Sequence, residues 1–94
     1  MNLCQVKGKC VSTIKNQDLI GHSLLIIQRI DSAGKKAKDV EVAVDPIGCS
    51  EGEYVIVSRG SSARFALGKE KSVIDAVIVG VVDQFELNNK KMEV

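Results

Sequence analysis

The sequence predicts an all-β fold, a small five-stranded barrel with one short helix between its fourth and fifth strands. Three observations lead to this prediction. Stretches in which apolar and polar residues alternate recur along the chain, and this period of two is typical of half-buried strands. Polar loops that contain glycine or proline separate these stretches, and only the segment 60–69 changes period. At 94 residues the chain has room for one domain, spanning 1–94.

The first strand is expected over residues 2–14. Cys4 and Val6 fall on one face and Lys7 on the other. Gly8 lies in mid-strand, where glycine often marks a bend or a bulge. The opening strand is therefore expected to be long and bent.

The second strand is expected over 22–31, after a loop over 15–21. Its apolar residues, from Leu24 to Ile27, fall alternately on both faces. A strand that is apolar on both faces is buried on both faces, but a small single-layer barrel offers only one interior. We therefore expect a neighbouring subunit to cover the outer face of this strand.

The third and fourth strands are expected over 39–45 and 53–59. A polar hairpin loop, 32–38, precedes the third strand, and Pro46 ends it because proline has no N–H for the ladder. Three residues of the third strand are expected to point into the barrel: Val40, Val42 and Val44.

The segment 60–69 predicts the short helix. Ser61 or Ser62 can cap its start, and Gly68 can end it. Arg64 would then lie in the first turn, where the helix dipole disfavours a cation. We infer that a carboxylate or carbonyl, on this chain or a neighbouring one, outweighs this effect.

The last strand is expected over 76–87, with Gly80 near its centre. The polar segment 88–94 is expected to be a flexible tail that frays unless a partner holds it. In many OB folds the helix joins strands three and four, whereas here it falls one strand later. The predicted barrel is therefore OB-like.

Composition argues against two classes of partner. The net charge is only +1, and the aromatic residues are limited to Tyr54, Phe65 and Phe85. Nucleic-acid binders usually present a basic patch, and single-strand binders also present aromatic platforms. No apolar run approaches the roughly 18 residues of a membrane span, and the first residues do not look like a signal peptide. We expect a cytoplasmic protein that binds neither nucleic acid nor membrane.

The sequence offers little for catalysis, metal binding or cofactor binding. There is one histidine, His22, and the three cysteines are scattered at Cys4, Cys10 and Cys49. This spacing gives neither a metal-ligand cluster nor a disulfide framework. A thiol-dependent enzyme that uses Cys49, with or without His22 as its base, stays open as an alternative.

Three segments carry a resemblance to a known family. They are 45–53 (DPIGCSEGE), 60–64 (GSSAR) and 74–83 (IDAVIVGVVD). Together they resemble the EutN/CcmL family, the vertex proteins of bacterial microcompartments, which include carboxysomes and ethanolamine- and propanediol-utilisation shells. The resemblance extends over nearly the whole chain to Asp83. Cys49 is a departure, because many members carry alanine there.

The resemblance implies a non-catalytic, OB-like barrel that assembles as a homopentamer and caps the vertices of a polyhedral shell built from hexameric proteins. Flat sheets of hexamers cannot close, and five-fold units supply the curvature. A ring needs a head-to-tail interface, which fits a second strand that is apolar on both faces. An OB-type nucleic-acid-binding module is the main alternative. The residues that we expect to matter for assembly are Asp45, Gly48, Gly60, Ser61, Ser62, Ala63, Arg64 and Asp83, with Asp45 and Asp83 as candidate acidic partners.

Overall fold

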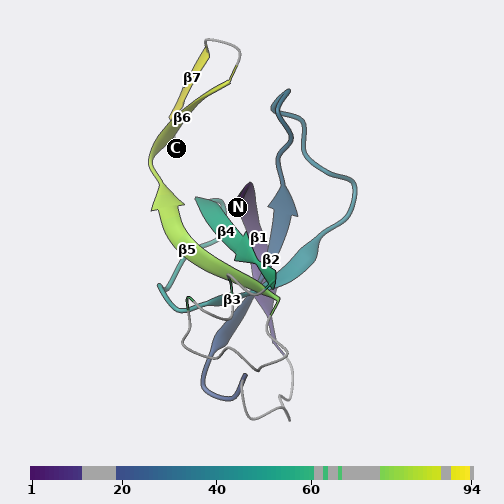
Figure 1. Ribbon diagram of the computed structural model, residues 1–94, viewed down its shortest axis with the longest axis vertical. Helices are drawn as coiled ribbons and strands as arrows, with labels where there is room; N and C mark the ends of the chain where they lie inside the picture. Colours follow the sequence, from purple (N-terminus) through teal and green to yellow (C-terminus); the bar gives the residue numbers. More distant parts are fainter. Residues whose placement is uncertain (12–18, 61–62, 64–65, 67–74, 88–89, 94) are drawn as a thin grey trace.

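Five strands close into a barrel, as the sequence predicts (Figure 1). The computed structural model describes residues 1–11, 19–60, 63, 66, 75–87 and 90–93. The barrel order is β1-β2-β3-β5-β4, and every neighbouring pair is antiparallel except β3 and β5. Closure removes the free edges that an open sheet of this size would expose. The strands are β1 (Asn2–Cys10), β2 (Ser23–Arg29), β3 (Glu41–Asp45), β4 (Tyr54–Arg59) and β5 (Ala76–Val82).

Strand β1 bends where the sequence predicts it. The register with β2 pairs Val6 with Ile27 and Gly8 with Ile26, so Lys7 is an extra residue and forms a bulge. The bulge helps β1 to pair with β2 on one side and with β4 on the other. The strand ends at Cys10, earlier than predicted, and residues 12–18 lie outside the described part of the chain.

The barrel interior is filled by small and branched aliphatic side chains. Ile27 from β2 and Ile78 from β5 are fully buried. Cys4 is also fully buried, where a free cysteine behaves as a small hydrophobic residue. The cluster of core residues comprises Cys4, Val6, Leu25, Ile27, Ala43, Val55, Val57, Ala76 and Ile78.

The prediction for the inward face of the third strand was wrong. Ala43 points into the barrel, while Val42 on β3 and Val40 just before it are 50% and 55% exposed. Val44 is buried, but in a second cluster outside the barrel, together with Ala63 and Val77. Alternation identifies two faces without showing which one meets the core. The more apolar face of β3 is therefore the outer one.

The end of the chain also differs from the prediction of one strand over 76–87. Strand β5 ends at Val82, and the chain bends at Asp83. Strands β6 (Gln84–Leu87) and β7 (Lys90–Glu93) then form a separate hairpin, with β7 inside the segment expected to be a tail. Figure 1 shows this hairpin standing away from the barrel.

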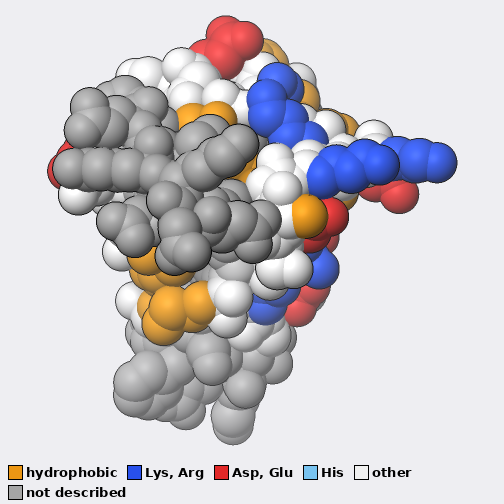
Figure 2. Space-filling model, turned by 90° about the horizontal axis from the view of Figure 1, so that it is seen from above, with side chains coloured by type: hydrophobic (Ala, Val, Ile, Leu, Met, Phe, Trp, Pro, Cys, Tyr) orange, Lys and Arg blue, Asp and Glu red, His pale blue; other side chains and the backbone are white. Residues whose placement is uncertain are grey.

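The connection between β2 and β3 is a second projecting feature. Residues 31–40 are all exposed. The Asp31 carboxylate accepts hydrogen bonds from the backbone N–H groups of Ala33 and Lys35, both at 2.9 Å, which holds the turn. On the face shown in Figure 2, basic and acidic side chains lie next to one another rather than forming a basic patch.

The predicted helix over 60–69 lies mostly outside the described residues, so it stays a prediction. Gly60, which is described, follows β4 with a φ of 63°. Its N–H donates a 2.9 Å hydrogen bond to the carbonyl of Asp75, which holds the ends of the connection between β4 and β5 together. Within the described residues, no helix has the length and apolar character needed to cross a membrane.

Candidate functional site

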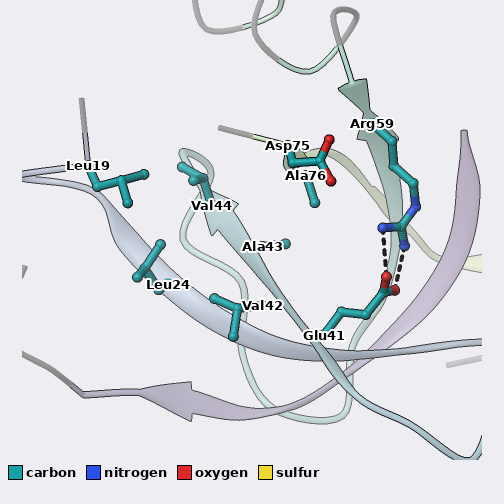
Figure 3. Close-up of a pocket in the computed structure, with 9 residues that line it drawn as sticks. All are labelled: Leu19, Leu24, Glu41, Val42, Ala43, Val44, Arg59, Asp75 and Ala76. Atoms are coloured by element: carbon teal, nitrogen blue, oxygen red, sulfur yellow. Dashed lines mark hydrogen bonds and ion pairs between the residues drawn. The ribbon is translucent and has the colours of Figure 1, made fainter. Parts of the chain in front are cut away.

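An open groove lies on the outer face of β2 and β3 (Figure 3). Its volume is about 340 Å³. Leu24, Val42 and Val44 supply an apolar lining, while Glu41, Arg59 and Asp75 add charge. The full lining comprises Leu19, Leu24, Glu41, Val42, Ala43, Val44, Arg59, Asp75 and Ala76. An apolar surface bordered by charges is typical of an interaction site.

The groove exists because β2 is apolar on both faces and the valines of β3 lie on its outer face. In β2, Leu25 and Ile27 are buried inside the barrel, whereas Leu24 and Ile26 on the outer face are only half-buried. Val42 on β3 continues this outer face and is 50% exposed. The expectation that the second strand has an outer apolar face is therefore supported, and within the single chain that face is not fully covered.

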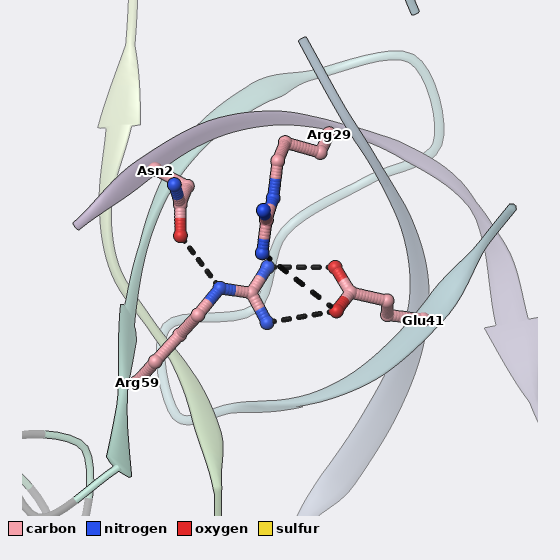
Figure 4. Close-up of polar contacts among 4 residues, drawn as sticks. All are labelled: Asn2, Arg29, Glu41 and Arg59. Carbon is pink, nitrogen blue, oxygen red and sulfur yellow. Dashed lines mark hydrogen bonds and ion pairs between the residues drawn. The ribbon is translucent and has the colours of Figure 1, made fainter. Parts of the chain in front are cut away.

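A polar cluster fastens four strands beside the groove (Figure 4). Arg59 donates two hydrogen bonds to the Glu41 carboxylate, from Nη1 to Oε1 at 2.9 Å and from Nη2 to Oε2 at 2.7 Å. Its Nε donates to Oδ1 of Asn2 at 2.6 Å. The Arg29 guanidinium lies 4.0 Å from the same carboxylate. A two-point arginine–carboxylate contact fixes both partners in orientation.

This cluster was not predicted from the sequence. The available signal was the position of the charges, because Arg29 ends β2, Glu41 begins β3 and Arg59 ends β4. The ends of antiparallel neighbours meet, which brings Arg29 of β2 near Glu41 of β3 and Asn2 of β1 near Arg59 of β4. The contact between Arg59 and Glu41 joins strands that are not neighbours and requires the closed barrel. Burial raises the pKa of the fully buried Cys4 thiol, although the nearby Arg59 acts in the opposite direction. That thiol is therefore not activated.

Asp45 organises the turn after β3. Its Oδ1 accepts hydrogen bonds from the N–H groups of Ile47 and Gly48, each at 3.0 Å, and its Oδ2 accepts one from Cys49 at 2.7 Å. Gly48 has a φ of 98°, which favours glycine. Burial raises the pKa of Asp45, but these backbone hydrogen bonds and the Cys49 thiol outweigh it, so the pKa lies below 3.8.

Cys49 is held in an unreactive environment. Its side chain packs against the barrel core. Burial, and then the negative charge of Asp45, raise the pKa of the thiol to about 11, and the hydrogen bond to Asp45 and the charge of Glu53 act in the same direction. A reactive thiol needs a lowered pKa. These observations argue against the thiol-dependent enzyme considered above.

The predicted site residues do not form one constellation in the structure. Asp45 and Gly48 share one turn, and Ala63 is fully buried in the outer cluster with Val44 and Val77. Asp83 is exposed and lines a separate hollow of about 400 Å³ with Glu51 and Glu53. Gly60 lies at the end of β4, and three further predicted residues lie outside the described part: Ser61, Ser62 and Arg64.

Metal binding finds no support in the described residues. No group of three or more histidine, cysteine, aspartate or glutamate side chains is arranged there to hold a metal ion. The groove is the candidate site, and its apolar lining with charged residues beside it is typical of an interaction surface.

A family model and two related proteins each match most of this chain. The family model described as "Ethanolamine utilisation protein EutN/carboxysome" matches residues 1–83. The carboxysome shell vertex protein CcmL of Gloeobacter violaceus is 38% identical, with coverage of 98% of this chain and 92% of that protein. The bacterial microcompartment shell vertex protein GrpN of Rhodospirillum rubrum is 47% identical, with coverage of 95% and 100%.

Solved structures of both relatives share the fold. The Gloeobacter violaceus CcmL structure superposes with a TM-score of 0.85 at 38% identity and covers 97% of this chain and 94% of that one. The structure of GrpN, described as a pentameric microcompartment shell protein, superposes with a TM-score of 0.80 at 45% identity, covering 92% and 98%.

The turn held by Asp45 predicts a specific response to acid. A lowered pKa means that ionised Asp45 stabilises the fold fully above its unfolded-state pKa, near 3.8, and that this contribution disappears as the pH falls through the lower folded-state pKa. Asp45→Ala also leaves three amides without their acceptor, so we expect it to cost about 1–3 kcal/mol near neutral pH.

Chemical denaturation at one protein concentration, repeated between about pH 6 and pH 3, measures this effect. The difference in free energy of unfolding between the wild type and Asp45→Asn should shrink as the pH falls below 3.8. A difference that grows toward acid pH would contradict the assigned direction.

The raised pKa of Cys49 predicts slow thiol chemistry. At pKa 11 instead of 9.0, the thiolate is about 100-fold scarcer near neutral pH, and its higher nucleophilicity recovers about six- to tenfold of that loss. Exchange with an aromatic disulfide reagent should be at least about tenfold slower than for a model thiol, with Cys49 located by peptide mapping. Asp45→Asn should accelerate the reaction. A wild-type rate equal to that of the model thiol would overturn the assignment.

Proposed function

Because this chain belongs to the EutN/CcmL family of microcompartment shell vertex proteins, we propose that it assembles as a homopentamer that closes the vertices of a polyhedral shell. Its role is structural. The outer apolar face of β2 and β3 is the observation that carries the proposal, because a single chain leaves this face only partly covered. A neighbouring subunit can cover this outer face while the barrel interior stays packed.

The ring follows from the position of the groove. The groove lies on one side of the barrel and presents the half-buried Leu24 and the exposed Val42. Cyclic rings with more than two members use head-to-tail contacts, in which one surface meets a different surface of the next subunit. Such a contact requires a groove on one side of each subunit and a different surface of the next subunit that fills it. The pentameric relative GrpN supports five as the ring size.

The loop that follows β4 adds a second set of assembly residues to the proposal. Gly60, Ser61, Ser62 and Arg64 directly follow Arg59 of the groove. We place Arg64 at the subunit boundary, with a carboxylate or carbonyl as its partner. Asp83 is the more available acidic candidate, because both carboxylate oxygens of Asp45 already accept backbone hydrogen bonds.

The pentamer works by shape rather than by catalysis. Hexameric shell proteins form flat facets, and this ring fits where five facets meet in a shell within the bacterial cytoplasm. The raised pKa of Cys49 agrees with a protein that carries no reaction centre. A nucleic-acid-binding role has no observation in its favour, because acidic and basic side chains are interspersed on the surface seen in Figure 2.

Val42→Asp tests the groove as the ring contact. A carboxylate placed in an apolar interface loses water without gaining a partner, so we expect the pentamer to dissociate into folded subunits. Val40→Asp is the matched control, because Val40 is equally exposed, at 55% against 50%, and does not line the groove. Analytical ultracentrifugation gives the mass, and circular dichroism confirms the barrel.

Co-assembly with hexameric shell proteins tests the vertex role. We expect closed particles in electron micrographs when the wild type or Val40→Asp is present, and open sheets or tubes with Val42→Asp. A Val42→Asp protein that keeps the pentamer mass would refute the groove as the contact. Closed particles without any ring-forming subunit would refute the vertex role.

A further inference from the structure

Strand β5 presents an uncharged apolar stretch to the outside of the molecule. Its sequence, AVIVGVV over Ala76–Val82, contains no charged residue and no proline. Val79 and Val81 are each 39% exposed. Short β-branched stretches without charge aggregate when they stay exposed, and proteins usually protect them. A specific partner surface is therefore expected to cover this part of β5.

Gly80 lies between the two exposed valines, and the fold of its own subunit does not require glycine there. The register pairs Gly80 with Ile56 and Ile78 with Val57, so Val79 forms a bulge. Gly80 does not have the positive φ of a bulge that needs a left-handed glycine. A Cβ atom added to it would meet no other described part of the chain within 4 Å. Glycine weakens a strand, and its presence there often marks the close approach of another chain.

Gly8 in β1 provides a comparison. It also lies beside a bulge and has no positive φ. A Cβ atom there would lie 4.0 Å from Cδ1 of Ile26, so a side chain of the same subunit already lies over Gly8. No described side chain lies over Gly80 in this way. The space above Gly80 is therefore open to another chain.

Gly80 belongs to a half-buried row on the outside of the barrel. Leu3 on β1 pairs with Ile56 on β4, and Ile56 pairs with Gly80 on β5. Paired residues share a face, and Ile56 alternates with the fully buried Val55 and Val57, so the row faces away from the core. We call these three half-buried residues, Leu3, Ile56 and Gly80, the β4 row.

The β4 row and the apolar lining of the groove lie on different sides of the barrel. In the groove, Leu24 lies on β2 and the exposed Val42 on β3. In the barrel order, β4 is next to β1 and β5 and next to neither β2 nor β3. A head-to-tail ring requires two different surfaces on each subunit, and the groove supplies only one of them.

The two surfaces match in shape and in charge. Val42 is a branched side chain that is 50% exposed, and the open space over Gly80 can receive such a side chain. The β4 row carries no charge. In the groove, Arg59 and Glu41 neutralise each other through their two hydrogen bonds, and Asp75 is exposed, as charges at the rim of an interface are.

We infer that the β4 row of one subunit covers the groove of the next, with Val42 seated over Gly80. This inference rests on the proposed pentamer and identifies the second surface of the ring contact. Position 80 is then kept as glycine by the neighbouring subunit rather than by its own fold.

Gly80→Ala in the full-length chain tests the open space. The added methyl group is compatible with the subunit's own fold but occupies the space assigned to Val42. We therefore expect the concentration at which half of the ring dissociates to rise at least about tenfold, and Gly80→Val to raise it further. Native mass spectrometry across a dilution series measures the dissociation, and circular dichroism shows that each barrel remains folded.

Gly8→Ala is the matched control. It makes the same change beside a bulge, but Gly8 belongs neither to the β4 row nor to the groove lining. We expect this variant to dissociate at the same concentration as the wild type.

An exchange of side-chain size tests the pairing itself. Val42→Ala weakens the ring by removing apolar contact, but it also makes room for the methyl group of Gly80→Ala. The double variant should therefore dissociate less readily than the two single effects predict when added. Gly80→Ala combined with Val40→Ala is the control, because Val40 does not line the groove, and we expect no recovery there.

The outcomes separate this inference from the proposed function. A wild-type pentamer in which Gly80→Ala and Gly8→Ala behave alike would overturn the β4 row as the second surface and leave the vertex role standing. Additive effects of Gly80→Ala and Val42→Ala would overturn the seating of Val42 over Gly80. An intact Gly80→Ala pentamer that no longer joins hexameric shell proteins would also overturn it, because the row would then contact the facets. A monomeric wild type would refute the ring itself.

Discussion

The structure depends on one constraint, which is that a small barrel has a single interior while β2 is apolar on both faces and the valines of β3 lie on its outer face. Leu25, Ile27 and Ala43 fill the interior. Leu24 and Val42 remain on the outside with only partial cover. The chain cannot satisfy both faces with its own barrel, so the outer face becomes a contact surface. In this protein, association is a consequence of how the strands are patterned rather than an addition to a finished monomer.

The polar features of the fold support that surface. Arg59, Glu41 and Asn2 link strands that are distant in sequence, and they hold the edge of the groove in place. On the other side, Asp45 fixes the turn after β3 through three backbone N–H groups, and Cys49 is kept protonated beside it. A structural protein depends on its shape, so fixed turns and a thiol that does not react both suit this function. Both features agree with a shell component that belongs to the EutN/CcmL family.

The sequence was a good guide to local structure and a poor one to long-range placement. Five strands, the bulge beside Gly8 and the two-sided second strand could all be predicted, because each leaves a local pattern. The inward face of β3 was mispredicted, since alternation is the same whichever face meets the core. The contact between Arg59 and Asn2 joins residues 57 positions apart and exists only once the barrel closes. No pattern in the sequence indicates the bend at Asp83. The roles of Ser61, Ser62 and Arg64 stay predictions.

The mass of the wild-type assembly in solution tests the central claim most directly. Native mass spectrometry of the full-length chain, taken over a wide dilution series, reports how many 10.1 kDa subunits associate. The account predicts a dominant species of five subunits that dissociates only at high dilution, because the outer face of β2 and β3 must remain covered. A monomer that persists at high concentration, with Val42 open to water, would contradict it.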